Sequence, residues 1–466
     1  MHLRARRSRR ARSVVARGKA ARKEVPRSRN AELDLRSRPD PIDLLEEQAR
    51  SRVPELVPLR YGRMMISPFT FFRGAALIMA SDLARTPSSG IRAQICGDAH
   101  LVNFGVFGTP ERRLIFDVND FDETLPGPWE WDVKRLAASL EIAGRSNGYG
   151  KQERRDIVVD AVRMYHETMV DLANKGILEV WYTALNVEAA LDEYGHRLKN
   201  RQRKQIDQVC AEATRRDSAH ALSKLTHVVN GARQIVSSPP LVVPLGELLG
   251  DAERAALETQ IRHAIDELGR SLPFERRVLF EQYRFVELAR KVVGVGSVGT
   301  RCWIALFLGA DEDDPLFLQI KEAEASVLER FVGASEYPNH GLRVVAGQRL
   351  MQAASDLLLG WTQASGIDSQ QRDFYVRQLR DWKGSFDVDE MAPSGLSLYG
   401  RLCAWTLARA HARSGDRVAI ASYLGTSDRF EKAIATFSAA YADQNERDHA
   451  ALVAAVRSGR VHAETG

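Results

Sequence analysis

Two acidic segments separated by a short apolar run constrain this chain more than any other feature of its sequence. The first reads Gly97-Asp98-Ala99-His100-Leu101-Val102-Asn103, and the second reads Asp117-Val118-Asn119-Asp120-Phe121-Asp122. Between them, Gly108-Thr109-Pro110-Glu111 is typical of a turn and Leu114-Ile115-Phe116 is typical of a β-strand. The pattern predicts a hairpin that holds two acidic loops next to each other.

These residue types at this spacing suit phosphoryl transfer. In that reaction a carboxylate takes the proton of the attacking hydroxyl, and hard oxygen ligands fix Mg²⁺ against the phosphates. We expect Asp98 to be the base, and Asn103 and Asp120 to be metal ligands with Asn103 also counted as catalytic. Asp122 is either a second metal ligand or a cap for backbone N–H groups of its own loop. Asp117 points away from Asp120 in an extended chain, which ranks it lower.

A glycine-rich segment and a lysine follow almost two hundred residues later. Residues 294–299 match G-x-G-x-x-G, and the β-branched and aromatic run after them predicts a hairpin over phosphates rather than a dinucleotide-binding helix. Leu316 to Lys321 reads as an apolar strand that ends in a single Lys, the expected catalytic partner of the α- and β-phosphates of ATP. The residues expected to line the phosphate site are Gly294, Gly296, Ser297, Gly299 and Lys321.

Longer stretches of the chain resemble a bacterial family called domain of unknown function 2252, from about Pro54 to Asp443. That family looks related to the protein kinase and aminoglycoside phosphotransferase superfamily. The resemblance implies Mg²⁺ and ATP as cofactors and a small-molecule acceptor as partner. The stretches that carry it are Phe71-Phe72-Arg73-Gly74, Cys96-Gly97-Asp98-Ala99-His100, Asn119-Asp120-Phe121-Asp122, Gln319-Ile320-Lys321-Glu322-Ala323 and Tyr375 to Ser385.

Three further roles follow from this resemblance. Residues 373–380 read as a strand leading to a hinge that would hold adenine through its backbone, with Arg377 facing substrate or phosphate. Trp131 to Ala137 is similar to the helix after the metal loop of aminoglycoside phosphotransferases, so Asp132 is expected to brace the base-bearing loop. The expected Lys–Glu ion pair is in doubt, because the helix at His340 to Ser355 carries Gln348 and no Glu.

The order of the motifs predicts a circular permutation, since the base-bearing loop precedes the glycine-rich loop. Such a permutation preserves a packed core when the old termini lie close together at a surface. We expect an α+β, protein-kinase-like two-lobed fold whose small β-rich lobe follows the catalytic loop and whose large lobe is mainly helical. Its expected parts are a disordered basic tail at 1–50, the large lobe with a helical insertion at 51–290, the small lobe at 291–390 and C-terminal helices at 391–466.

The breakpoint of the permutation stays open at this level. Phe69 to Ala84 and Leu398 to Ala412 are both apolar-periodic helices that suit the place before the base-bearing loop. The chain has 466 residues, and 44% of them are hydrophobic, which is enough for a large core. No apolar run approaches the length of a membrane span and no secretory signal begins the chain, so we expect a cytoplasmic protein. Its four cysteines are widely spaced and predict neither zinc nor disulfides.

The basic charge is concentrated at the start of the chain. Residues 1–30 hold twelve Lys and Arg and one acid, about +11, whereas the whole chain carries +5, so the remainder carries about −6. The tail predicts at most weak contact with nucleic acid or another anionic surface. We expect a phosphotransferase, with adenylyl transfer or an inactive nucleotide-binding pseudokinase as the alternative and nucleic-acid binding through the Arg-rich tail as a further one.

Overall fold

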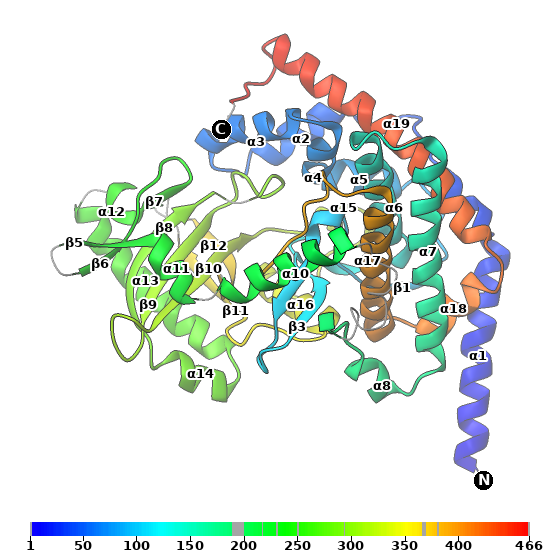
Figure 1. The fold of residues 1–466 in the computed structure, drawn as a ribbon, viewed down its shortest axis with the longest axis horizontal. Helices are drawn as coiled ribbons and strands as arrows, with labels where there is room; N and C mark the ends of the chain where they lie inside the picture. Colours follow the sequence, from blue (N-terminus) through cyan, green and yellow to red (C-terminus); the bar gives the residue numbers. More distant parts are fainter. Residues whose placement is uncertain are drawn as a thin grey trace.

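An antiparallel sheet and a larger bundle of helices lie side by side in the computed structural model (Figure 1). The structure describes residues 2–188, 200–216, 218–229, 232–248, 251–292, 294–365, 370–379 and 382–464. We call the described residues of 218–379 the sheet part and those of 2–188 and 382–464 the helical part. The predicted α+β class is confirmed at this level.

The sheet has six strands in the order β11-β12-β10-β9-β8-β7, and every neighbouring pair is antiparallel. Strand alternation gives the sheet two different faces. In β10, Leu318 and Ile320 point to one face, whereas Gln319 and Lys321 point to the other. The strands are β7 (Val242–Pro244), β8 (Arg284–Lys291), β9 (Cys302–Leu308), β10 (Pro315–Ala323), β11 (Gly360–Ser365) and β12 (Gln371–Gln378).

Helices cover both faces of the sheet. On the face of Leu318, α13 (Asp251–Ser271) and α14 (Phe274–Phe280) pack through an apolar cluster that includes Leu268 and Phe307. On the other face, α11 (Ser218–Leu225) contributes Leu222 to a second cluster with β9 and β10. α16 (His340–Met351) crosses the sheet near β11 and β12. The predicted small-lobe range 291–390 therefore begins too late, because β7 and β8 already belong to this sheet.

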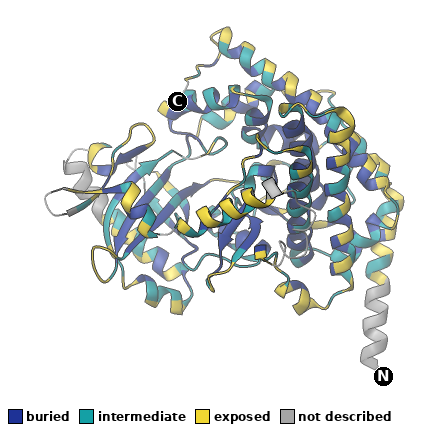
Figure 2. Cartoon of the chain, viewed as in Figure 1, coloured by how far each residue is buried: buried dark blue, intermediate teal, exposed yellow. Residues whose placement is uncertain are grey.

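The helical part is built around two long helices, α6 (Trp129–Ser146), which is almost fully buried, and α17 (Pro393–Ser414), which is buried mainly in its C-terminal half (Figure 2). Acidic residues in the first turn of α6 and Arg145 in its last turn complement the helix dipole. α17 packs along α7 (Lys151–Asn174) and also against α6, and Gly400 permits the close approach to α6, because a Cβ there would lie 2.9 Å from the side chain of Leu140. α18 (Arg417–Leu424) and α19 (Arg429–Arg457) complete the bundle.

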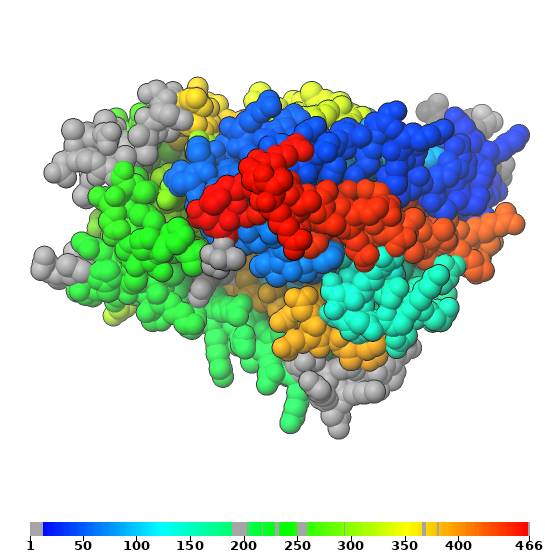
Figure 3. Space-filling view, turned by 90° about the horizontal axis from the view of Figure 1, so that it is seen from above, coloured from blue at the N-terminus to red at the C-terminus, as the bar shows by residue number. Residues whose placement is uncertain are grey.

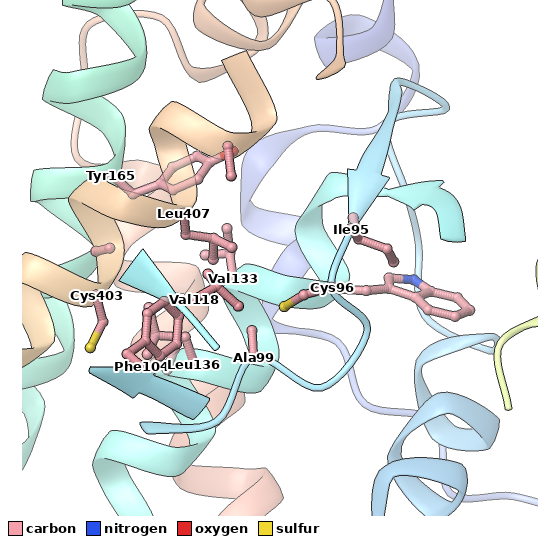
Figure 4. Packing of buried hydrophobic residues seen from close by; sticks show 14 of the residues in the cluster. Ile95, Cys96, Ala99, Phe104, Val118, Val133, Leu136, Tyr165, Cys403 and Leu407 are labelled. Atoms are coloured by element: carbon pink, nitrogen blue, oxygen red, sulfur yellow. The ribbon is translucent and has the colours of Figure 1, made fainter. Parts of the chain in front are cut away.

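Two small two-stranded antiparallel sheets lie outside the six-stranded sheet. In one, β1 (Arg92–Ile95) pairs with β4 (Leu125–Pro128); in the other, β2 (Phe104–Gly108) and β3 (Leu114–Val118), which lie between β1 and β4 in the sequence, form a hairpin. The second is the hairpin predicted between the two acidic loops. Figure 4 shows how Cys96 and Ala99, at the start of the first loop, lie against Val133 and Leu136 of α6. Apolar contacts thus fix the hairpin and its loops on the helical bundle.

α17 is the helix that braces this hairpin. Its Tyr399 hydroxyl donates to the carbonyl oxygens of Leu101 and Phe104, at 2.9 and 3.0 Å, and its Arg409 pairs with Asp117 of β3. The competing candidate, residues 69–84, is divided into α4 (Pro68–Gly74) and α5 (Ala76–Leu83) at Ala75. Of the two candidates, the C-terminal one therefore contacts the first acidic loop and the hairpin that follows it.

The N-terminal segment corrects the prediction of a disordered tail over 1–50. It forms α1 (His2–Glu24), α2 (Pro41–Ala49) and, further on, α3 (Val57–Met65), and α1 packs against α18. Arg38 is buried between the carboxylates of Asp82 and Asp448, each at 2.6 Å. Seen from above, this segment runs beside the C-terminal helix α19 (Figure 3). The prediction of disorder rested on charge composition, which carries no information about these tertiary contacts.

The remaining described elements are short or lie at the surface. Part of the range predicted as a helical insertion forms the hairpin β5–β6 beside the sheet. No helix in the described residues has the length and apolarity needed to cross a membrane. The short or surface elements are η1 (Arg27–Ala31), η2 (Pro54–Leu56), η3 (Leu101–Asn103), α8 (Ile177–Tyr182), α10 (Asn200–Arg215), β5 (Thr226–Val229), β6 (Ala232–Ile235), α12 (Leu245–Leu248) and α15 (Glu329–Val332).

Candidate active site

A polar cavity of about 150 Å³ lies where the sheet part meets the acidic loops of the helical part. Its wall combines residues that the sequence separates by almost two hundred positions. The predicted site residues that line it are Asp98, Asn103, Asp120, Asp122, Gly294, Gly296 and Ser297. The structure thus brings the two acidic loops and the glycine-rich turn to one cleft.

Asp98 lies in the first loop with its side chain about one-fifth exposed. One carboxylate oxygen accepts a hydrogen bond from Arg135 Nε at 2.8 Å, and the other lies 3.8 Å from His100 Nε2. Burial raises the pKa of Asp98, and the Arg135 guanidinium offsets part of this shift. Burial together with Arg135 lowers the pKa of His100, so its imidazole is neutral near pH 7. Asp98 is therefore a carboxylate with raised proton affinity that faces the cavity.

The backbone of this loop is held from α6 and α17. The carboxylate of Asp132 accepts from the N–H groups of Cys96 and Gly97 at 2.8 and 2.9 Å. His411 of α17 contacts the same carboxylate at 3.2 Å, and Tyr165 bonds the other ring nitrogen of His411 at 2.9 Å. The bracing role that the resemblance implied for Asp132 is confirmed by these contacts.

Asn103 ends the first loop. Its side-chain N–H donates to the carbonyl oxygen of Asp98 at 2.8 Å, which fixes the amide and leaves its oxygen for another partner. Cys96, which precedes the loop, is buried, and burial raises the pKa of its thiol well above the usual range. A thiol in such an environment is a poor nucleophile.

The second loop carries two carboxylates with different partners. Asp122 is bonded by Lys321 Nζ and by the Tyr375 hydroxyl, the latter at 2.8 Å. Asp120 accepts the N–H of Asp122 at 3.1 Å and lies 4.0 Å from Lys321. Burial and the neighbouring Asp122 raise the pKa of Asp120, whereas Lys321 and Tyr375 outweigh burial and lower that of Asp122. Asp122 is thus the ion-pair partner of Lys321, and the carboxylate of Asp120 is the less tightly paired of the two.

Lys321 reaches the acidic loops from the centre of the sheet. It lies between Cys302 of β9 and Tyr375 of β12, and only 3% of it is exposed. Burial alone would lower the pKa of its ammonium group, but the carboxylates of Asp122 and Asp120 raise it well above the usual range. The partner of Lys321 is thus an Asp of the second loop, whereas the sequence had suggested a search for a Glu.

Of the predicted site residues, Lys321, Arg377 and Gly299 lie beside the cavity and are absent from its wall. Arg377 donates to the carbonyl oxygen of Asn119 at 2.8 Å and to Gln319 Oε1 at 3.2 Å, so its guanidinium holds the second loop rather than facing the cavity. Gly299 has φ +88°, and its carbonyl accepts from Val53 N at 2.8 Å. Only glycine adopts this φ readily, so Gly299 shapes the turn between β8 and β9.

Sequence reasoning missed Arg343 of α16. Only 1% of this residue is exposed, and its guanidinium donates to the carbonyl oxygens of Thr124, Asp122 and Glu324 at 2.7, 2.8 and 2.9 Å. It therefore joins α16 to the second acidic loop and to the end of β10. The sequence did carry one signal, since Arg343 lies on the apolar face of a predicted helix. An arginine at such a position is buried, and a buried arginine must donate to several acceptors.

The donor set fits a magnesium ion. Asp120, Asp122 and the side-chain oxygen of Asn103 are hard ligands around one cavity, and Mg²⁺ characteristically keeps several waters beside one or two carboxylates. Within the described ranges no cluster of three or more His, Cys, Asp or Glu side chains is arranged as a metal site.

Comparison with known proteins assigns the chain to a family. The model of a family described as an uncharacterized protein conserved in bacteria (DUF2252) matches residues 52–455. This range covers most of the chain, so the protein belongs to that family. No curated protein and no solved structure matched. The family leaves the reaction to be inferred from the geometry of the cleft.

Proposed function

We propose that this member of the DUF2252 family is a Mg-ATP-dependent phosphotransferase that acts on a small-molecule acceptor. The observation that carries the proposal is the shared cavity of Asp98, Asn103, Asp120 and the glycine-rich turn. A base, oxygen ligands and a phosphate-covering loop are the parts that phosphoryl transfer requires in one place. Lys321 adds a buried cation beside the two carboxylates.

The arrangement of elements supports a kinase-like fold in permuted order. β8 and β9 flank the glycine-rich turn, β10 carries Lys321, and α16 then precedes β11 and β12. α17 follows this sheet in the sequence and packs against the hairpin that bears the acidic loops. In a protein kinase the chain would continue from that helix into the base-bearing loop. Here that loop is at residues 97–103, so we infer that the chain has been opened between these two points.

In this mechanism Asp98 accepts the proton of the acceptor hydroxyl as its oxygen attacks the γ-phosphorus. The O–P bond to the acceptor forms, the bond to the β-γ bridging oxygen breaks, and ADP leaves with that electron pair. Asn103 and Asp120 would hold Mg²⁺, which would neutralise charge on the phosphate oxygens. The raised pKa of Asp98 makes its carboxylate a stronger base than an exposed one.

Lys321 would leave Asp122 in part to pair with the α- and β-phosphates. Gly296 and Ser297 also line the cavity, and the backbone N–H groups of such a turn suit phosphate oxygens. Arg135 orients the Asp98 carboxylate through its Nε bond, and His100 stays neutral beside it. The side chains thus divide into a base side around Asp98 and a phosphate side around Lys321.

One observation favours the alternative, a nucleotide-binding protein that transfers adenylyl or does not turn over. Lys321 is bonded to Asp122, and α16 carries no acidic residue that could pair with Lys321 when nucleotide arrives. An ammonium group held by a metal-loop carboxylate is less free to contact phosphates. Both alternatives use the same cleft. Adenylyl transfer differs from phosphoryl transfer in that the α-phosphorus is attacked instead of the γ-phosphorus, and the inactive protein attacks neither.

Label transfer from ATP separates these functions. The purified chain is incubated with Mg²⁺, a metabolite extract and either γ-labelled or α-labelled ATP. We expect γ-label in a product, and we expect Asp98→Asn to lower the rate by about 10²–10⁴-fold. Asp428→Asn, at an exposed helix start, is the matched control. Transfer of α-label indicates adenylyl transfer, and γ-transfer unchanged by Asp98→Asn removes Asp98 from its role.

A further inference from the structure

Three arginines from the N-terminal segment form one wall of the cleft. Arg52 precedes η2, Arg60 lies in α3 and Arg73 lies in α4, and all three line the cavity that contains Asp98. Arg73 belongs to the motif Phe71-Phe72-Arg73-Gly74, to which the proposed mechanism gives no role. We refer to these three residues as the arginine wall.

The guanidinium groups of the arginine wall are incompletely paired. Arg60 has no exposed surface, and its Nε and Nη1 atoms have no hydrogen-bond partner among the described residues. The Nε atoms of Arg52 and Arg73 also have none there. Burial lowers the pKa of all three groups. Buried cations without an anion are costly, so the wall is suited to an anionic ligand.

Arg73 lies on the base side of the cleft. The carbonyl oxygen of its neighbour Phe72 accepts from Arg135 Nη2 at 2.7 Å, and Arg135 Nε bonds Asp98. The carboxylates that act on Arg73 are Asp389 and Asp98, whereas those that act on Lys321 are Asp122 and Asp120. Two cationic regions therefore flank the cavity, one beside the base and one beside the second acidic loop.

We propose that the arginine wall, through Arg73 above all, binds an anionic group of the acceptor, so that the substrate is an anionic metabolite such as a phosphate ester. This inference rests on the proposed phosphotransferase function. The acceptor hydroxyl must approach Asp98, and Arg73 is the cation on that side. A guanidinium presents parallel N–H groups that match two oxygens of a phosphate or carboxylate. Lys321 remains for the triphosphate.

Calorimetric titration with inorganic phosphate tests the site independently of turnover. The full chain is titrated alone and again with saturating Mg-AMP-PNP, which occupies the triphosphate side. We expect phosphate to bind in both cases, and we expect Arg73→Gln to weaken phosphate at least about tenfold while changing AMP-PNP less than about twofold. Arg73→Lys should give an intermediate loss, because it keeps the charge without the paired N–H groups. Arg284→Gln, 68% exposed on β8, is the control.

The outcomes distinguish an anion site for the acceptor from one for the triphosphate of ATP. Phosphate that is displaced by AMP-PNP, or AMP-PNP binding that falls with Arg73→Gln, assigns the wall to the triphosphate and overturns the proposal. Absence of phosphate binding, or equal binding by Arg73→Gln and the unmodified chain, also overturns it. Arg73-dependent phosphate binding without any AMP-PNP binding supports the anion site and counts against the phosphotransferase function instead.

Discussion

At the scale of single residues, Glu123 makes stability depend on pH. This cleft residue accepts the N–H of Val327 at 2.7 Å, yet burial raises its pKa to about 7. Between the ordinary pKa near 4.5 and about 7, the folded chain binds a proton that the unfolded chain has lost, so stability falls as pH rises through this window. We expect Glu123→Gln, compared with the unmodified chain, to gain about 3 kcal/mol between pH 4.5 and pH 8.

Urea unfolding at both pH values measures this difference. Gln keeps an oxygen that can accept the Val327 N–H, so the variant isolates the charge from the hydrogen bond. Glu336→Gln, at an exposed position, is the matched control and should show no such gain. A Glu123→Gln chain that follows the unmodified protein at both pH values would show that this carboxylate titrates normally.

Asp117 illustrates a residue whose role is structural. Arg409 Nη2 lies 2.6 Å from both of its carboxylate oxygens, each side chain is 1% exposed, and Ala353 N donates to it at 2.8 Å. We expect Asp117→Ala to destabilise the fold by about 3–5 kcal/mol, because it leaves the Arg409 guanidinium buried without its anion. Urea unfolding gives the change in free energy.

The control for this pair is the exposed one between Asp160 and Arg163. Asp160→Ala should cost only about 0.2–1 kcal/mol. Adding Arg409→Met to Asp117→Ala should recover part of the lost stability, because no buried charge then remains. If the single and double variants are equally unstable, the loss arises from packing rather than from the unpaired cation.

Sequence spacing was sufficient to find the residues that converge on the cleft, and insufficient to find how they pair. Asp98, Asn103 and Asp120 were recognisable because phosphoryl chemistry restricts both residue type and spacing. The partners of Lys321 and the contacts of Arg343 were not, since each joins elements about two hundred residues apart. Arg377 was misread for the same reason, because its acceptor is a backbone carbonyl on another loop.

At the scale of elements, hydrophobic and turn patterns predicted β3, β9, β10 and α17, and the family resemblance predicted β12 and α16, but net charge misled for α1. A helix that holds ten Lys and Arg residues still docks when a narrow face fits its neighbour. Gly18 supplies that face, since a Cβ there would lie 2.2 Å from the carbonyl oxygen of Ala419 in α18. Close backbone approach of this kind leaves no signature in composition.

Gly18→Val therefore tests whether α1 is docked. We expect its added side chain to push α1 from α18 and to speed amide hydrogen exchange over residues 13–24 at least about tenfold. Ala20→Val, at an exposed position of the same helix, introduces the same β-branched residue and should leave the exchange nearly unchanged. Equal exchange rates in both variants would mean that α1 does not depend on this contact.

At the scale of the whole molecule, a few buried polar contacts join the sheet part to the helical part. Lys321 and Tyr375 reach Asp122, Arg377 reaches Asn119, and Arg343 reaches Thr124. Asn119, Asp122 and Thr124 all lie in the second acidic loop or directly after it. A ligand that binds across the cleft must therefore act on the same contacts that hold the two parts together, so binding and stability are coupled.

Mg-ATP should stabilise the whole chain through this coupling. At about one hundred times its dissociation constant, a ligand that binds only the folded state adds about 2.7 kcal/mol, which raises the unfolding temperature measured calorimetrically. We expect Lys321→Met to lose most of this ligand-induced rise, whatever its own baseline stability. Lys432→Met, on the exposed face of α19, should keep it. Asp120→Ala should lose the part of the rise that depends on Mg²⁺. A full rise in Lys321→Met would place ATP away from Lys321, because a nucleotide that contacts this ammonium group cannot bind equally well without it.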